Sequence, residues 1–134
     1  MSVTAAKAFA SLGIACSYCG DEASSIDHIN PLSAFASLSK EGQRAIFGTD
    51  DPNSGSNLTP ACRSCNASKK DTPLRIWIQR CVAEVFGCYA PSPTRSRVAS
   101  AILTGRCADW VADVAREAVS DMAGALATFQ DELK

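Results

Sequence analysis

The pattern of hydrophobic and polar positions changes several times in the first half of the chain, and each change predicts a different element. The alanine-rich segment 2–13 predicts a short helix. In "SSIDHINP" (24–31), polar and apolar residues alternate enough for a short strand that Pro31 ends. Residues 38–48 predict a second helix. The turn-forming residues of "TDDPNSGSN" (49–57) then predict a loop that is a candidate for substrate contacts.

The second half of the chain is mainly helical in pattern. Residues 57–71 predict an extended piece, a turn and the start of a helix. Apolar residues follow a helical spacing over 72–90, which predicts a helix there. Residues 91–105 begin with two closely spaced prolines and predict a further short helix. In 107–133, apolar residues recur alternately every three and four positions, as in a long amphipathic helix. That stripe is expected to pack on the domain, with a homodimer through 107–133 as the alternative.

Length and composition indicate one folded domain. The chain has 134 residues, of which 46% are hydrophobic and 20% charged, as expected for a globular protein with a modest core. There is no run of 18 apolar residues, and the N-terminus has no pattern of a secretory signal. We therefore expect a cytoplasmic, intracellular protein with no membrane partner.

Charge is distributed unevenly along the chain, although the net charge is −1. Between Arg63 and Arg106 there are eight basic and two acidic residues, whereas from Cys107 onward there are six acidic and two basic residues. A basic segment is typical of a nucleic-acid-binding surface. Ordinary solvated faces are the other interpretation of such runs.

Four of the seven cysteines form two Cys-x-x-Cys pairs separated by 42 residues. In a reducing compartment, two such pairs favour one tetrahedral structural zinc site rather than disulfides. The predicted ligands are Cys16, Cys19, Cys62 and Cys65. The remaining thiols, Cys81, Cys88 and Cys107, are more typical of small buried apolar side chains.

His28 is the only histidine in the chain and directly follows Asp27. Four thiolates would complete a zinc site without it. A solitary histidine is most often a structural residue that satisfies its own hydrogen bonds, and a catalytic base is the other interpretation.

The residues around His28 and the second cysteine pair follow a defined order. Asp-His-x-x-Pro occupies 27–31, Asn-Leu follows at 57–58, and Cys-x-x-Cys-Asn-x-x-Lys occupies 62–69. Together with the first cysteine pair, residues 16–70 resemble the HNH endonuclease family in every element of its pattern and in the same order.

The resemblance implies an α+β fold of the ββα-metal type, similar to a treble clef. Two short antiparallel strands and a helix would surround the catalytic ion, and the structural zinc would tie the ends together. Over 1–134, this gives a single nuclease domain with an N-terminal helix (1–15), a zinc-bound core (16–72) and a helical C-terminal extension (73–134).

The resemblance also implies roles for individual residues. His28 would be the general base that activates water, and Asn57 would fix the loop and orient His28. Asp27 and Asn66 would hold a single catalytic divalent cation, Mg²⁺ or Mn²⁺. Position 66 is asparagine, where the motif that names the family has histidine.

Four cations near the motif are candidates for phosphate contacts, namely Arg63, Lys69, Lys70 and Arg75. Trp77 lies on an apolar helix face, so we expect it in the core rather than stacked on a base. The predicted partner is DNA, and the sequence does not separate DNA from RNA.

The function implied by the resemblance is hydrolysis of phosphodiester bonds in DNA by a metal-dependent endonuclease. A zinc-stabilised nucleic-acid-binding module with a vestigial nuclease site is the alternative, and an interaction protein that uses its C-terminal helix is a third. Small members of the family often belong to phages, mobile elements or restriction systems, and we expect one of these contexts.

Overall fold

The computed structural model describes residues 8–132, except residues 10, 86, 88 and 89. Residues 8, 9, 11 and 12 are helical, and the remainder of the predicted N-terminal helix lies mostly outside the described residues. Cys88 lies outside them as well. No helix in the described part of the chain combines the length and the apolar character needed to cross a bilayer.

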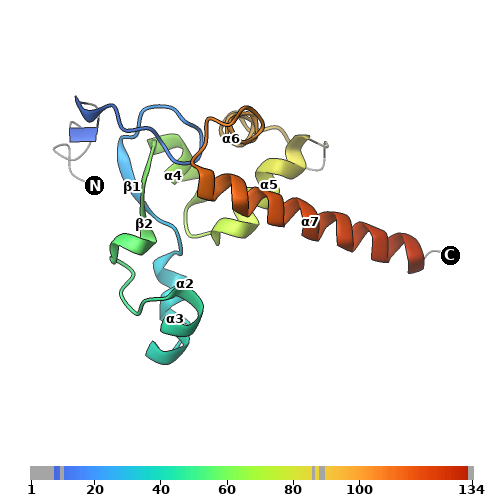
Figure 1. The fold of residues 1–134 in the computed structure, drawn as a ribbon, viewed down its shortest axis with the longest axis horizontal. Helices are drawn as coiled ribbons and strands as arrows, with labels where there is room; N and C mark the ends of the chain where they lie inside the picture. Colours follow the sequence, from blue (N-terminus) through green and yellow to red (C-terminus); the bar gives the residue numbers. More distant parts are fainter. Residues whose placement is uncertain (1–7, 10, 86, 88–89, 133–134) are drawn as a thin grey trace.

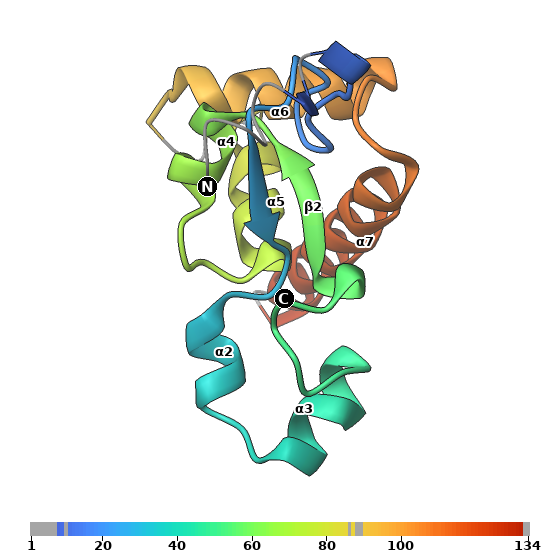
Figure 2. The same cartoon turned by 90° about the vertical axis from the view of Figure 1, so that its left-hand side faces the viewer.

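Two short antiparallel strands form the centre of residues 16–72. β1 (Ser25–His28) pairs with β2 (Leu58–Ala61), so that Ser25 lies opposite Ala61 and His28 opposite Leu58. Helix α4 (Arg63–Lys69) follows β2 and packs beside β1 (Figure 2). The mixed fold of helices and a two-stranded antiparallel sheet confirms the predicted α+β class.

The segment that joins the strands lies beyond one end of the sheet (Figures 1 and 2). It contains α2 (Leu32–Ala36), α3 (Lys40–Phe47) and the 3₁₀ turn η1 (Gly55–Asn57). The predicted helix at 38–48 corresponds to α3. The five-residue helix α2 was not predicted, because so short a segment carries little periodic signal.

Three longer helices make up the rest of the molecule: α5 (Leu74–Val85), α6 (Pro93–Thr104) and α7 (Asp109–Glu132). They coincide with the three helices expected from the apolar spacing. Both α6 and α7 pack against α5, and the C-terminal half of α7 extends away from the other elements (Figure 1).

One hydrophobic core joins the cysteine pairs to the C-terminal helices. It contains Tyr18 and Cys65 from the first part of the chain, and Trp77, Val98 and Val111 from the helices. Trp77 is only 1% exposed, which confirms its predicted core position. The helical extension therefore shares its buried surface with the strands and the cysteine turns.

Candidate metal centres and active site

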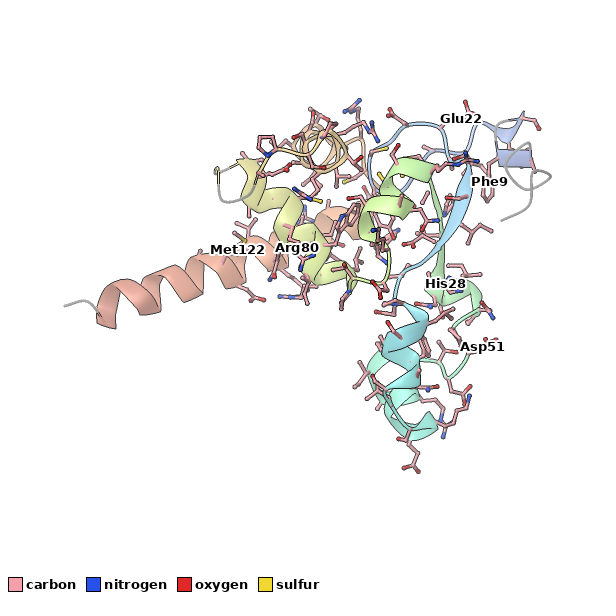
Figure 3. The ribbon with its side chains drawn as sticks, turned by 180° about the vertical axis from the view of Figure 1, so that it is seen from behind. Phe9, Glu22, His28, Asp51, Arg80 and Met122 are labelled. Carbon is pink, nitrogen blue, oxygen red and sulfur yellow. The ribbon has the colours of Figure 1, made fainter. Side chains whose placement is uncertain are left out.

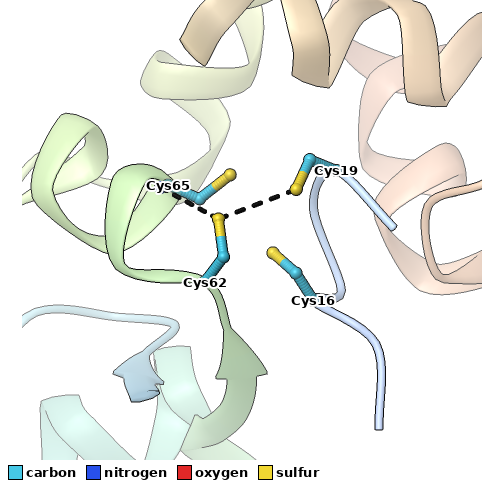
Figure 4. Close-up of side chains that lie close together, drawn as sticks. All are labelled: Cys16, Cys19, Cys62 and Cys65. Carbon is cyan, nitrogen blue, oxygen red and sulfur yellow. Dashed lines mark hydrogen bonds between the residues drawn. The ribbon is translucent and has the colours of Figure 1, made fainter. Parts of the chain in front are cut away.

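The four cysteines of the two pairs converge at one point (Figure 4). All four sulfur atoms lie within 4.8 Å of one another, and the Sγ atoms of Cys19 and Cys62 are 3.7 Å apart. A tetrahedral zinc ion with Zn–S bonds of about 2.3 Å needs sulfurs roughly 3.8 Å apart. The cluster therefore has the ligand type, number and spacing to hold one zinc ion.

Local sequence explains why the thiols converge. Gly20 follows the first pair with φ +80°, and a Cβ there would lie 2.7 Å from the carbonyl oxygen of Arg106, so only glycine fits. The backbone N–H of Cys16 donates to the carbonyl of Asp21 at 2.6 Å and closes this turn. In the second pair, Cys62 caps α4, and its sulfur accepts from the N–H of Cys65.

Thiols of the cluster change one another's pKa values. A hydrogen bond with Cys65 lowers the pKa of Cys16 to about 5 and raises that of Cys65. Burial raises the pKa of Cys19 to about 11. Because four thiolates repel one another in a buried site, full deprotonation requires a cation among them.

Two other cysteines fit the structural role expected for them. Cys81 and Cys107 are buried, and burial raises the pKa of both thiols, to about 12 for Cys81. Neither belongs to the four-sulfur cluster. Neutral, buried thiols of this kind are unreactive.

His28 is the last residue of strand β1 and lies at the end of the sheet that faces the inserted loop. Figure 3 shows it at the same end of the sheet as Asp51. Its Nε2 lies 2.8 Å from Oδ1 of Asn53, and the backbone N–H of Asn53 donates to the Asp51 carboxylate. An amide oxygen only accepts, so this pairing places the proton on Nε2 and leaves a lone pair on Nδ1.

Asn57 acts on the loop rather than on the imidazole ring. Its Oδ1 accepts from the N–H of Asn30 at 2.8 Å, and its Nδ2 donates to the carbonyls of Asn30 and Pro52. Asn57 is 2% exposed and ties the residues after β1 to the loop that carries Asn53. We predicted that Asn57 would fix the loop and orient His28. Its side chain contacts the loop, and Asn53 contributes the side chain that is hydrogen-bonded to the ring.

Asp27 is buried on the opposite face of β1 from His28, as strand alternation requires. Its Oδ2 accepts from the hydroxyl of Tyr18 at 2.5 Å and lies 3.2 Å from Nζ of Lys69. Burial, followed by the charge of Asp27, raises the pKa of Tyr18 above its ordinary value, so the hydroxyl remains a donor.

Asn66 lies on the helix that packs against β1. Its Nδ2 donates to Oγ of Ser25 at 3.1 Å and to the carbonyl of Ile26 at 3.4 Å. Ser25 and Asp27 are two residues apart and share a strand face, so the amide of Asn66 lies on the side of Asp27. A carboxylate and an amide oxygen are ligands that suit a hard divalent cation.

The four basic residues expected to contact phosphates occupy different environments. Lys69 has a fully buried side chain, and its Nζ also donates to the carbonyl of His28 at 2.9 Å, so the expected phosphate contact is wrong for this residue. Arg75 forms ion pairs with Glu117 and Asp121, which offset its charge. Arg63 and Lys70 are exposed, and no ion pair within the described ranges involves either of them.

These features define a class of small metal-binding domain. A two-stranded sheet and a helix are closed by a four-cysteine cluster, and an Asp-His pair ends the first strand. Residues 16–72, less than half of the chain, match the family model of the HNH endonuclease.

A second comparison also finds an endonuclease. Over 73 residues, 52% of this chain, the sequence is 33% identical to the CRISPR-associated endonuclease Cas9 of Actinomyces naeslundii. The match spans 5% of that protein, so the likeness concerns one segment of a much longer chain. No solved structure matches this chain.

We predict that the cysteine cluster binds one zinc ion that the fold requires. Cys62→Ser should lose the zinc and lower the thermal midpoint by more than about 10 °C, because a structural zinc contributes several kcal/mol to folding. Metal analysis and thermal unfolding would measure both effects. Cys81→Ala is the matched control and should keep one zinc per chain. Equal zinc contents in Cys62→Ser and the wild type would contradict the site.

Proposed function

We propose that this protein is a metal-dependent endonuclease that hydrolyses phosphodiester bonds in DNA with His28 as the general base. The observation that carries this proposal is the environment of His28. Its ring is held through Nε2 by Asn53, and Nδ1 is left to accept a proton from water. The ring is half-buried at the end of β1, next to the inserted loop.

Asp27 and Asn66 are the residues we propose for the catalytic cation. They lie on the same side of β1 and offer oxygen atoms, as Mg²⁺ or Mn²⁺ prefers. When bound, such an ion neutralises charge that develops on the phosphoryl oxygens. Asp27 and His28 leave β1 on opposite faces, so the scissile phosphate would lie across the end of this strand.

The remaining residues serve to position the base and the substrate. Asn53 holds the imidazole, and Asn57 holds the loop of Asn53. Arg63 and Lys70, at opposite ends of α4, are the exposed cations we propose for the phosphate backbone. The zinc in the cysteine cluster would stabilise this arrangement without taking part in the chemistry.

Replacing His28 tests the general base directly. His28→Ala should reduce the rate of plasmid cleavage with Mg²⁺ or Mn²⁺ by about 10²–10⁴, the usual contribution of a general base. Glu41→Ala, at an exposed position on α3, is a surface control that should cleave as the wild type does. Equal cleavage by His28→Ala and the wild type would remove His28 from the mechanism. Nucleic-acid binding without cleavage by the wild type would favour the vestigial binding module.

Asn53 should contribute to catalysis through the orientation of His28. Asn53→Ala removes the acceptor at Nε2 and should lower the cleavage rate roughly tenfold, which corresponds to a hydrogen bond of about 1.4 kcal/mol. Asn53→Asp keeps an acceptor and should retain most of the activity. Single-turnover cleavage rates distinguish the variants, and an unchanged rate for Asn53→Ala would show that the contact has no role.

Arg63 should add one phosphate contact to DNA binding. Arg63→Ala should weaken binding to unrelated sequences uniformly, and the slope of log K against log[salt] should become shallower by about 0.9. Arg116, an exposed cation on α7, provides the charge-matched control, and Arg116→Ala should leave the slope unchanged. Fluorescence anisotropy at several salt concentrations would measure the slopes. Equal changes in both variants would indicate only an effect of net charge.

A further inference from the structure

Tyr18 combines an apolar position with a polar group. It lies between the two cysteines of the first pair and is fully buried. Its ring packs edge-on against Trp77 and Trp110, with centroids 5.1 and 6.1 Å away. Phenylalanine could make the same ring contacts. The hydroxyl must therefore have a partner that compensates for its loss of water.

That partner is the carboxylate we propose as a ligand of the catalytic cation. The hydroxyl of Tyr18 donates to Oδ2 of Asp27 at 2.5 Å, and Nζ of Lys69 approaches the same oxygen at 3.2 Å. These two contacts hold the carboxylate in one orientation. Within the described ranges, no hydrogen bond or ion pair involves the other oxygen, Oδ1, which is thus left to act as a ligand.

The backbone on both sides of Tyr18 is anchored. Cys16 and Cys19 belong to the four-sulfur cluster. Ser17 donates its N–H to the carbonyl of Pro60 at 3.0 Å, and its Oγ lies 2.6 Å from Oγ1 of Thr59. The first cysteine turn is thereby attached to strand β2, and the position of the Tyr18 hydroxyl depends on an intact cluster.

We propose that Tyr18 is a positioning residue that links the cysteine cluster to the catalytic cation by orienting Asp27. The zinc centre then has a second effect besides stabilising the fold, since it fixes the turn from which Tyr18 reaches the carboxylate. This inference rests on the proposed function, because it requires Asp27 to bind the catalytic cation. Residues that orient a metal ligand commonly change metal affinity by 10–100-fold.

The test measures cation binding directly and does not depend on cleavage. The zinc-loaded full chain is titrated with Mn²⁺, and free Mn²⁺ is followed by electron paramagnetic resonance. Tyr18→Phe, which removes only the hydroxyl, should raise the Mn²⁺ dissociation constant roughly tenfold and keep one zinc. Ser64→Ala, which removes an exposed hydroxyl from α4, is the control and should change this constant less than about twofold.

Asp27→Asn separates the proposed cation site from the positioning role of Tyr18. It should abolish the Mn²⁺ site, and Tyr18→Phe should have no further effect in that background, because Tyr18 acts through Asp27. If Asp27→Asn leaves Mn²⁺ binding unchanged, the proposed catalytic cation site is wrong. If Asp27→Asn abolishes binding but Tyr18→Phe binds Mn²⁺ as the wild type does, only the positioning role is overturned. Equal losses in Ser64→Ala and Tyr18→Phe would also overturn it.

A second measurement retains the hydroxyl and does not depend on the folding of Tyr18→Phe. With 3-fluorotyrosine placed at position 18, the fluorine resonance should shift as Mg²⁺ binds, because the hydroxyl contacts the ligand carboxylate. An unchanged resonance at Mg²⁺ concentrations that fill the site would contradict the proposal.

Discussion

The attachment of the first cysteine turn to the start of α4 is the constraint on which the rest of the structure depends. Two strands of four residues each are too short to form a stable sheet in water by themselves. The four thiols join segments on both sides of the long insertion between the strands, and so fix the ends of the ββα unit. Because four thiolates in such proximity would repel one another, a cation bound among them would stabilise this unit.

The proposed catalytic groups lie along the strand that this anchor holds. β1 leads away from the cysteine cluster and places Asp27 and His28 at its far end, on opposite faces. Lys69 bridges them from α4, because it contacts the carboxylate of Asp27 and the carbonyl of His28. The buried ammonium thus offsets the carboxylate charge and fixes the end of the strand. A buried charge pair of this kind costs desolvation, which fits a positioning role better than a gain in stability.

Residue types and spacing predicted the secondary-structure elements well. They predicted the contacts between side chains less well. The strands, the four thiol ligands and helices α3 to α7 followed from local patterns. The ion pairs of Arg75 with α7 did not, because they depend on how distant helices pack. Asn53 was expected only as part of a loop that is a candidate for substrate contacts. Its contact with His28 was not predicted, because it depends on the conformation of that loop. The burial of Lys69 did have a signal, because it follows buried Cys65 by four residues and shares its helix face.

The C-terminal helices take part in the support of the site, although they lie outside the segment that matches the family. Two of the side chains that cover Tyr18 come from outside residues 16–72. Trp77 of α5 covers the Tyr18 ring and donates its indole N–H to Oγ of Ser68 on α4, and Trp110 of α7 covers a second edge. The hydroxyl of Tyr18 can hold Asp27 only while these rings exclude water from the contact. We infer that α5 and α7 belong to the same cooperative unit as the cysteine cluster rather than to an appended module.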